Sequence, residues 1–220
     1  MIFCFSDIDF DDVVEDYGAL ISPNDTVILS REITGVIDLP AEHGGYSHVL
    51  RDMIVFSKIK EIILIVGMRA KIGERFYNCA LLIDSGQVLG VSDEIYPIKG
   101  YEKGSIVRSY LTSRGKVCLF VDSDICYPQL WQGCFSSCRY ILSLNSIPIN
   151  KERITCAKTL AIASGKHVLA QFCDACVSIN QYGKIESVKR GRMMAFYLPI
   201  SLNKGRIVDR KIKFVEETGD

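Results

Sequence analysis

The residues that could do chemistry are concentrated where an apolar run ends, in VCLFVDSDICYPQLW (residues 117–131). Apolar residues lead directly into Asp122, Ser123 and Asp124, and Cys126 follows. A buried strand that ends in polar residues delivers their side chains to one place, so this segment predicts a site. A Cys nucleophile would need a base within hydrogen-bond reach. From the residues alone, Asp122, Asp124, Cys126 or none of them is the reacting group.

The chain has nine cysteines, and the free-thiol interpretation is favoured for them because the number is odd and most lie in apolar runs. The N-terminus is acidic and has no basic region before an apolar one, so we expect no signal peptide and a cytoplasmic location. Cys173 with Cys176, and Cys134 with Cys138, have spacings that could suggest zinc. No His accompanies the first pair, and we expect these cysteines to be small buried hydrophobes, with no metal bound.

Composition sets the class of protein. The chain has 220 residues, of which 48% are hydrophobic and 24% charged, as in an ordinary globular domain. Lys plus Arg equals Asp plus Glu at 26 each, so the sequence carries no electrostatic signature of a nucleic-acid partner. The longest apolar run, near Ile62–Val66, is too short to span a bilayer, and no membrane association is expected.

Strand patterns alternate with helix patterns along the chain, which predicts a mixed α/β layered domain. The predicted helices are Asp11–Ile21, Tyr46–Lys58, Pro128–Ser137 and Lys151–Ser164, the last ended by Gly165. The predicted strands are Ile2–Phe5, Thr26–Ser30, Ile62–Met68, Tyr77–Ile83, Gln87–Val91, Lys116–Val121, Tyr140–Leu144, His167–Phe172, Ala175–Asn180, Ile185–Val188 and Met193–Pro199.

Several of these segments resemble the carbon–nitrogen hydrolase (nitrilase) superfamily. YNCALLIDSGQVLG (77–90) is similar to that family's hairpin, and GKV (115–117) with VDSDICYPQLW (121–131) is similar to its strand and nucleophile elbow. DTVILSRE (25–32), RYILSLN (139–145) and CAKTLAIASGKHV (156–168) resemble other strands and a helix of the family.

The order and spacing of these segments cover most of the chain. The resemblance implies a nitrilase-like four-layer α-β-β-α sandwich of two mixed sheets flanked by helices. It also implies a single carbon–nitrogen hydrolase-like domain over residues 1–220, with a charged C-terminal tail at about 203–220. Homodimers are usual in this family, so a homodimer is expected.

The same resemblance assigns three catalytic positions. In the family a Cys attacks a nitrile or amide carbon, a Glu is the general base and a Lys stabilises the developing charge. Glu32 takes the position of the Glu, but Glu94 stands at the Lys position and Asp122 at the Cys position. Cys126 lies four residues after Asp122, on a turn into a helix, and is not expected to replace the lost thiol. The family mechanism is therefore expected to be absent.

Three further residues are predicted to line the pocket: Asn78, Asp124 and Glu102. Asp124 keeps a family Asp and is expected to hold the turn by accepting backbone N–H bonds. Glu102 resembles a further family carboxylate, and a solvated loop charge is the alternative interpretation.

Clustered carboxylates need compensation, because like charges in a partly buried cavity raise at least one pKa. Protonation, basic neighbours such as Arg31 or Lys99, or a hard cation could each supply it. We favour protonation combined with basic neighbours, and expect no cofactor.

Two functions follow from the sequence. One is a catalytically inactive member of the family, with a binding or scaffold role and an amide-like small molecule as its candidate ligand. The other is an active hydrolase of a small amide or another C–N bond, in which Asp122 and Glu32 or Glu94 act as a carboxylate pair.

Overall fold

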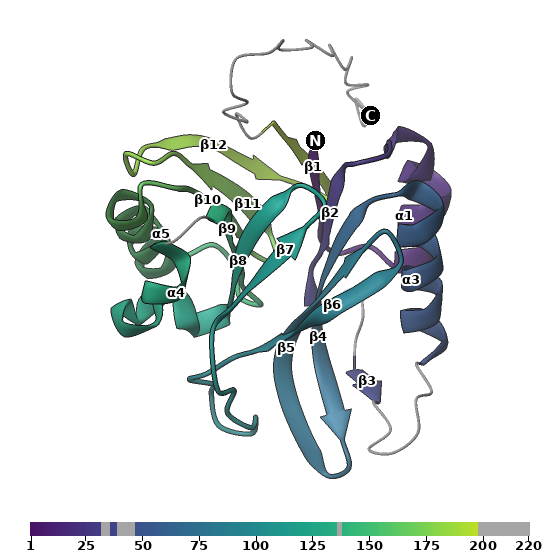
Figure 1. The fold of residues 1–220 in the computed structure, drawn as a ribbon, viewed down its shortest axis with the longest axis horizontal. Helices are drawn as coiled ribbons and strands as arrows, with labels where there is room; N and C mark the ends of the chain where they lie inside the picture. The colour runs from purple at the N-terminus through teal and green to yellow at the C-terminus, as the bar shows by residue number, and fades with distance from the viewer. Residues whose placement is uncertain (32–35, 39–46, 136–137, 198–220) are drawn as a thin grey trace, which may run out of the picture.

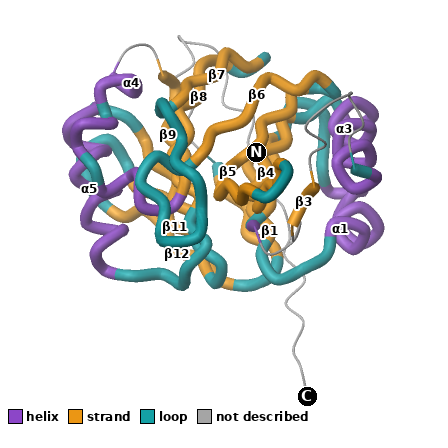
Figure 2. Tube along the Cα trace, turned by 90° about the horizontal axis from the view of Figure 1, so that it is seen from below, coloured by secondary structure: helices purple, strands orange, loops and turns teal. Residues whose placement is uncertain are grey.

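The computed structural model describes residues 1–31, 36–38, 47–135 and 138–197. Two sheets pack face to face, and helices cover the outer face of each (Figure 1). Figure 2 shows the same layers from a second direction, with α1 (Phe10–Tyr17) and α3 (His48–Lys60) on one side and α4 (Gln132–Phe135) and α5 (Lys151–Ser164) on the other. The expected four-layer α-β-β-α sandwich of two mixed sheets is therefore confirmed.

The first sheet has the order β13-β1-β2-β4-β5-β6, with β3 paired to β4. The strands β1, β2 and β4 are parallel, and the β4–β5–β6 meander and β13 are antiparallel to their neighbours. Its strands are β1 (Ile2–Phe5), β2 (Thr26–Leu29), β3 (Val36–Asp38), β4 (Ile63–Ile72), β5 (Arg75–Asp84), β6 (Gln87–Asp93) and β13 (Met193–Phe196).

The second sheet has the order β12-β11-β10-β9-β8-β7. Here β8, β9 and β10 are parallel, so their carboxyl ends meet at one edge of the sheet. Its strands are β7 (Arg108–Thr112), β8 (Gly115–Val121), β9 (Cys138–Leu144), β10 (His167–Gln171), β11 (Ala175–Ile179) and β12 (Ile185–Arg190). Short 3₁₀ helices occur at η1 (Gly18–Leu20), η2 (Asp122–Cys126) and η3 (Pro128–Leu130).

Continuous apolar strands are explained by burial on both faces, because successive side chains point to opposite sides of a sheet. In β1, Ile2 and Cys4 face the second sheet, whereas Phe3 and Phe5 pack with α1 and α3. In β8, Val117, Leu119 and Val121 face the first sheet, and Cys118 and Phe120 pack with α4 and α5. The core therefore has three layers: one between the two sheets, and one between each sheet and the helices that cover it. The alternation of side chains along the strands determines which residues enter each layer.

Local signals agree with the observed helix ends. Asn150 caps α5 by accepting a hydrogen bond from the backbone N–H of Arg153 at 2.8 Å. The helix stops at Gly165, whose φ of 64° is in the left-handed region that favours glycine. Its observed range is the predicted one.

Some elements differ from the sequence prediction. The expected helix Pro128–Ser137 is two short pieces, η3 and α4. The strands β3 and β7 were not predicted: β3 has only three residues, and β7 (RSYLT) lacks an apolar run but pairs with β8. The predicted tail at 203–220 lies outside the described residues. In the part of the chain that is described, no helix is long and apolar enough to cross a membrane.

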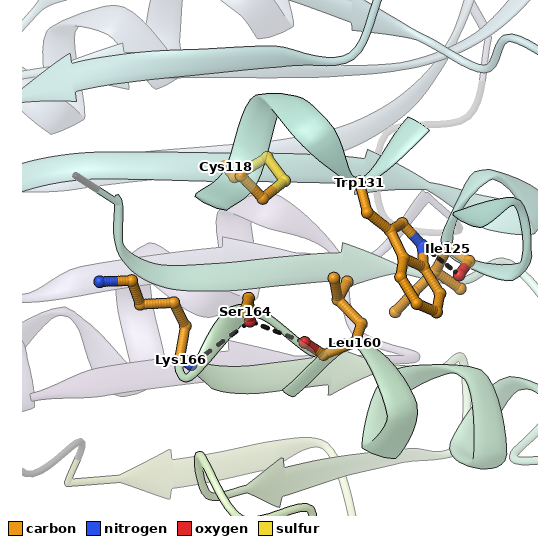
Figure 3. The surroundings of a disulfide bond; sticks show 7 residues. Cys118, Ile125, Trp131, Leu160, Ser164 and Lys166 are labelled. Carbon is orange, nitrogen blue, oxygen red and sulfur yellow. Dashed lines mark hydrogen bonds between the residues drawn. A yellow bond between two sulfur atoms is a disulfide. The ribbon is translucent and has the colours of Figure 1, made fainter. Parts of the chain in front are cut away.

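The prediction of free thiols throughout is wrong for one pair. Cys118 on β8 and Cys134 on α4 form a disulfide, drawn in Figure 3 beside Trp131 and Leu160. The two residues belong to one buried cluster, so packing of α4 onto the sheet brings the sulfurs together across 16 residues of sequence. Cys138 and Cys176 are buried, as expected of small hydrophobes, and Cys173 is half-buried.

Candidate functional site

Asp122 lies at the sharp turn where β8 ends and η2 begins. Its φ is 45°, in the left-handed region that residues other than glycine seldom adopt and that Asp tolerates better than most. The turn directs the carboxylate into the protein, where the residue is 5% exposed. An elbow of this kind holds a single side chain in a strained, defined position, which is a feature of functional sites.

Asn78, on β5 of the first sheet, and Ser146, in the loop after β9 of the second, donate hydrogen bonds to Asp122. Ser146 donates from its backbone N–H at 2.8 Å and from its hydroxyl at 2.9 and 2.7 Å, and Asn78 Nδ2 donates at 2.6 Å. Ser146 follows β9 by two residues, and β9 is the parallel neighbour of β8. The carboxyl-end edge of one sheet thus meets β5 of the other, which carries Asn78.

Two arginines place positive charge beside the same carboxylate. Arg31 Nη1 lies 3.7 Å from Asp122 Oδ2, and Arg153 Nη1 lies 3.8 Å from Oδ1. Arg153 is in the first turn of α5 and also donates to Asn145 Oδ1 at 3.0 Å. Buried carboxylates are stable when paired and hydrogen-bonded, and Asp122 is both.

Glu94 is joined to Asp122 through Asn78. Asn78 Nδ2 also donates to Glu94 Oε2, at 2.7 Å, and its Oδ1 accepts from Arg31 Nη1 at 3.2 Å. Glu94 is 2% exposed and accepts two more bonds from Ser123, at 3.0 Å from the backbone N–H and 2.7 Å from the hydroxyl. The two carboxylates therefore share one amide donor in a connected polar network.

Asp124 is buried on the same 3₁₀ helix but has a different role. Its carboxylate accepts bonds from the backbone N–H of Ile95, at 3.0 and 2.9 Å, and of Tyr96 at 3.1 Å. It was expected to accept backbone N–H bonds in its own turn, and these donors instead belong to the segment after β6. The pKa of Asp124 is raised to about 7, mainly by burial; the bonds from Ile95 and Tyr96 oppose the rise, and the charges of Glu94 and Asp122 add to it.

The structure brings Glu94, Asp122 and Asn78 together, with Asp124 next to them. Glu102 is exposed, as in the solvated-charge interpretation, and its backbone N–H donates to the carbonyl of Phe76 at 2.7 Å. Glu32 lies outside the described residues. Of the two suggested basic neighbours, Arg31 contacts Asp122 and Lys99 is exposed.

Ser123, Ser146 and Arg153 were not predicted to belong to the site. The two serines had an available signal, because each follows a predicted apolar strand and strand ends of a parallel sheet lie side by side. Arg153 had none: its place beside Asp122 depends on how α5 packs on the sheet.

Cys126 has the properties of a structural thiol. Burial, together with the neighbouring Cys156, raises its pKa to about 12, so almost no thiolate forms at neutral pH. The nearby Trp131 is buried and donates from its indole N–H to the carbonyl of Ile125 at 3.0 Å. Neither residue faces the cavity beside Asp122.

A cavity of about 10 Å³ lies beside Asp122, which is room for about one water molecule. Ser30 and Gln171 also line it; both are buried, and Ser30 Oγ and Gln171 Oε1 have no hydrogen-bond partner within the described residues. Across residues 1–31, 36–38, 47–135 and 138–197, no group of three or more His, Cys, Asp or Glu side chains could hold a metal ion. Around Asp122 and Glu94, hydrogen-bonded polar side chains thus occupy the site and leave room for about one water molecule.

Several solved structures have a fold similar to that of this chain. Saccharomyces cerevisiae Nit3, a member of branch 10 of the nitrilase superfamily, superposes with a TM-score of 0.68 at 10% identity, covering 83% of this chain and 78% of that chain. The NitN amidase from Neterenkonia sp. AN1 gives 0.68 at 10% identity, over 93% and 96% of the two chains. XC1258 from Xanthomonas campestris, a CN-hydrolase superfamily protein with an arsenic adduct in its active site, gives 0.65 at 14% identity, over 88% of each.

No protein-family model and no curated protein matches the chain by sequence. At identities of 10 to 14%, the likeness to these structures is one of backbone fold. The superpositions cover most of this chain and of each compared chain. The chain has the fold of the nitrilase superfamily, the carbon–nitrogen hydrolases.

Proposed function

We propose that this protein uses the nitrilase fold as a binding or scaffold module and does not hydrolyse C–N bonds by a Cys-dependent mechanism. The observation that carries the proposal is the state of Asp122. The residue at the end of β8, where the family resemblance expects a thiol, is a carboxylate bound by Ser146 and Asn78 and paired with arginines. A carboxylate held by so many donors is a weak nucleophile, because attack would sacrifice those interactions.

The replacement of the expected Lys by Glu94 supports the same conclusion. A cation stabilises the oxyanion that forms when a nucleophile attacks an amide carbon, and a carboxylate would destabilise it. Glu94 is held by Asn78 and by Ser123. The small volume of the cavity beside Asp122 favours a scaffold role over binding of an amide in that cavity.

A second candidate, a hydrolase with a carboxylate-based mechanism, rests on one specific contact. Asn78 Nδ2 donates to Glu94 and to Asp122 together, so two carboxylates of a connected network lie close to the cavity. Paired carboxylates in different environments can act as acid and base or as nucleophile.

Ammonia release from small aliphatic amides, carbamoyl compounds and nitriles tests both candidates. The wild type, Asp122→Asn and Cys126→Ala are compared, each with and without iodoacetamide blocking. We expect no turnover by any of them. Turnover that is lost in Asp122→Asn but survives thiol blocking would establish the carboxylate mechanism, and turnover that thiol blocking removes would contradict both candidates.

A further inference from the structure

Cys4 and Cys176 approach each other across the interface between the two sheets. Cys4 is on β1, in the interior of the first sheet, and Cys176 is on β11 of the second. Their sulfurs are 3.3 Å apart, and both residues are completely buried in the inter-sheet core. The sheets thus bring together two thiols that are 172 residues apart in sequence.

At this distance one thiol donates a hydrogen bond to the other, and the sulfurs are farther apart than in a disulfide. A disulfide has an S–S length of about 2.05 Å, so a relative movement of roughly 1 Å would join them. Side-chain rotation and small shifts of the sheets can supply a movement of that size. The chain already joins Cys118 to Cys134 in the outer layer, so disulfide formation is compatible with this fold.

We propose that Cys4 and Cys176 oxidise to a second disulfide during folding or opening of the sandwich, and that this bond ties the two sheets together. The oxidant is a low-molecular-weight disulfide such as oxidised glutathione. One protein thiolate attacks that disulfide and releases one small thiol, giving a mixed disulfide. The second protein thiolate then attacks the mixed disulfide and releases the second small thiol. Two protein thiols lose two electrons and two protons, and one small disulfide becomes two small thiols.

The exchange takes place while the sheets are apart. Burial, together with the neighbouring Cys4, raises the pKa of Cys176 well above its usual range, so the closed sandwich contains almost no thiolate at this position. The packed core also has no room for a mixed disulfide with a tripeptide. The bond therefore forms during folding or opening, and in the closed sandwich it is out of reach of a reductant.

The pair lies next to the candidate site. Cys176 is opposite Gln171 in the β10–β11 register, and Gln171 lines the cavity beside Asp122. Gln171 Nε2 donates to the carbonyl of Phe5, the residue after Cys4, at 2.8 Å. A bond between the sulfurs would thus fix the separation of the sheets where their side chains form the wall of the cavity.

The test is oxidative refolding of the whole chain. Protein reduced and unfolded in urea is diluted into a buffer of reduced and oxidised glutathione, or into a non-thiol reductant as a control. Remaining thiols are blocked with N-ethylmaleimide in denaturant, and peptides are mapped by mass spectrometry. We expect a cross-linked peptide containing Cys4 and Cys176 only after oxidative refolding. We also expect the urea midpoint of this protein to exceed that of the reduced protein by roughly 1–2 M.

Variants separate this bond from the other disulfide. Cys4→Ala and Cys176→Ala should lose the cross-linked peptide and the part of the midpoint shift that this bond contributes, and keep the part that comes from Cys118–Cys134. Cys79→Ala, which removes an equally buried thiol that donates to the carbonyl of Met68, should keep both. Quantitative maleimide labelling of Cys4 and Cys176 after oxidative refolding of the wild type would overturn the proposal, as would linkage of Cys176 to Cys173. This readout needs no variant to fold.

Discussion

Asp122 and Asp124 are both buried on the same 3₁₀ helix, but different parts of the molecule stabilise them. Asp122 is bound mainly by side chains, which come from β5, the β9 end, the β2 end and α5. Asp124 is bound by backbone amides of one segment, Ile95 and Tyr96. The first carboxylate depends on four elements being packed correctly, and the second on one loop, so substitutions at the two positions should have different consequences.

The largest expected effect is that of Asp122→Ala. The substitution leaves the largely buried guanidinium groups of Arg31 and Arg153 without this counter-charge, and removal of one partner of a buried ion pair costs about 3 kcal/mol or more. Alanine also fits the positive φ of this residue less well than Asp does. Equilibrium unfolding in urea measures the loss of stability.

Asp122→Asn is the matched control for this substitution. It removes the same negative charge beside Arg31 and Arg153 but keeps an acceptor for Ser146 and tolerates the left-handed backbone, so it should lose somewhat less free energy of unfolding than Asp122→Ala. If the Ala variant unfolds at the urea concentration of the wild type, the arginine contacts do not stabilise the fold.

The second effect is a pH dependence that belongs to Asp124. Its pKa in the folded state is about 7, above the ordinary value of 3.8, so between these values the folded state binds more protons than the unfolded state. The stability that this group contributes is therefore fully present below about pH 4 and is lost as the pH rises through about 7. Between about pH 5 and pH 7.5 the loss should be roughly 2 kcal/mol.

Asp124→Asn removes this ionisation and retains a carbonyl acceptor for the amides of Ile95 and Tyr96. The difference in free energy of unfolding between wild type and variant should therefore shrink as the pH rises across that interval. Urea titrations of both proteins at several pH values measure it. A difference that is independent of pH would show that the carboxyl of Asp124 titrates in its ordinary range.

The smallest effect concerns the helix that positions Arg153. Asn150→Ala removes the side-chain cap of α5, which accepts from the Arg153 N–H, and should cost about 1 kcal/mol. Asn150→Ser restores a capping oxygen and should recover most of that stability in the same urea assay. Equal destabilisation by both substitutions would assign the loss to something other than the cap. Neither substitution should change the stability that Asp124 contributes, because its hydrogen-bond donors lie after β6.

The sequence by itself determined the layers and most of the elements. Apolar runs such as Ile2–Phe5 predict strands buried on both faces, and the cap and stop residues of α5 define its range. The abrupt change from Val121 to Asp122 located the site, because a strand end is a local signal. Asn78, Glu94 and Asp124 were placed near it through the family resemblance, and the structure brings them there.

Only the tertiary structure decided what neutralises that site and which cysteines meet. Arg153 reaches Asp122 because α5 packs on the second sheet, and Cys4 reaches Cys176 because two sheets stack. Likewise, Cys118 bonds to Cys134 because α4 lies over β8. Contacts of this kind join residues distant in sequence, and no periodicity or spacing encodes them. They depend on the packing of whole elements, which is the physical reason they could not be predicted from the residues alone.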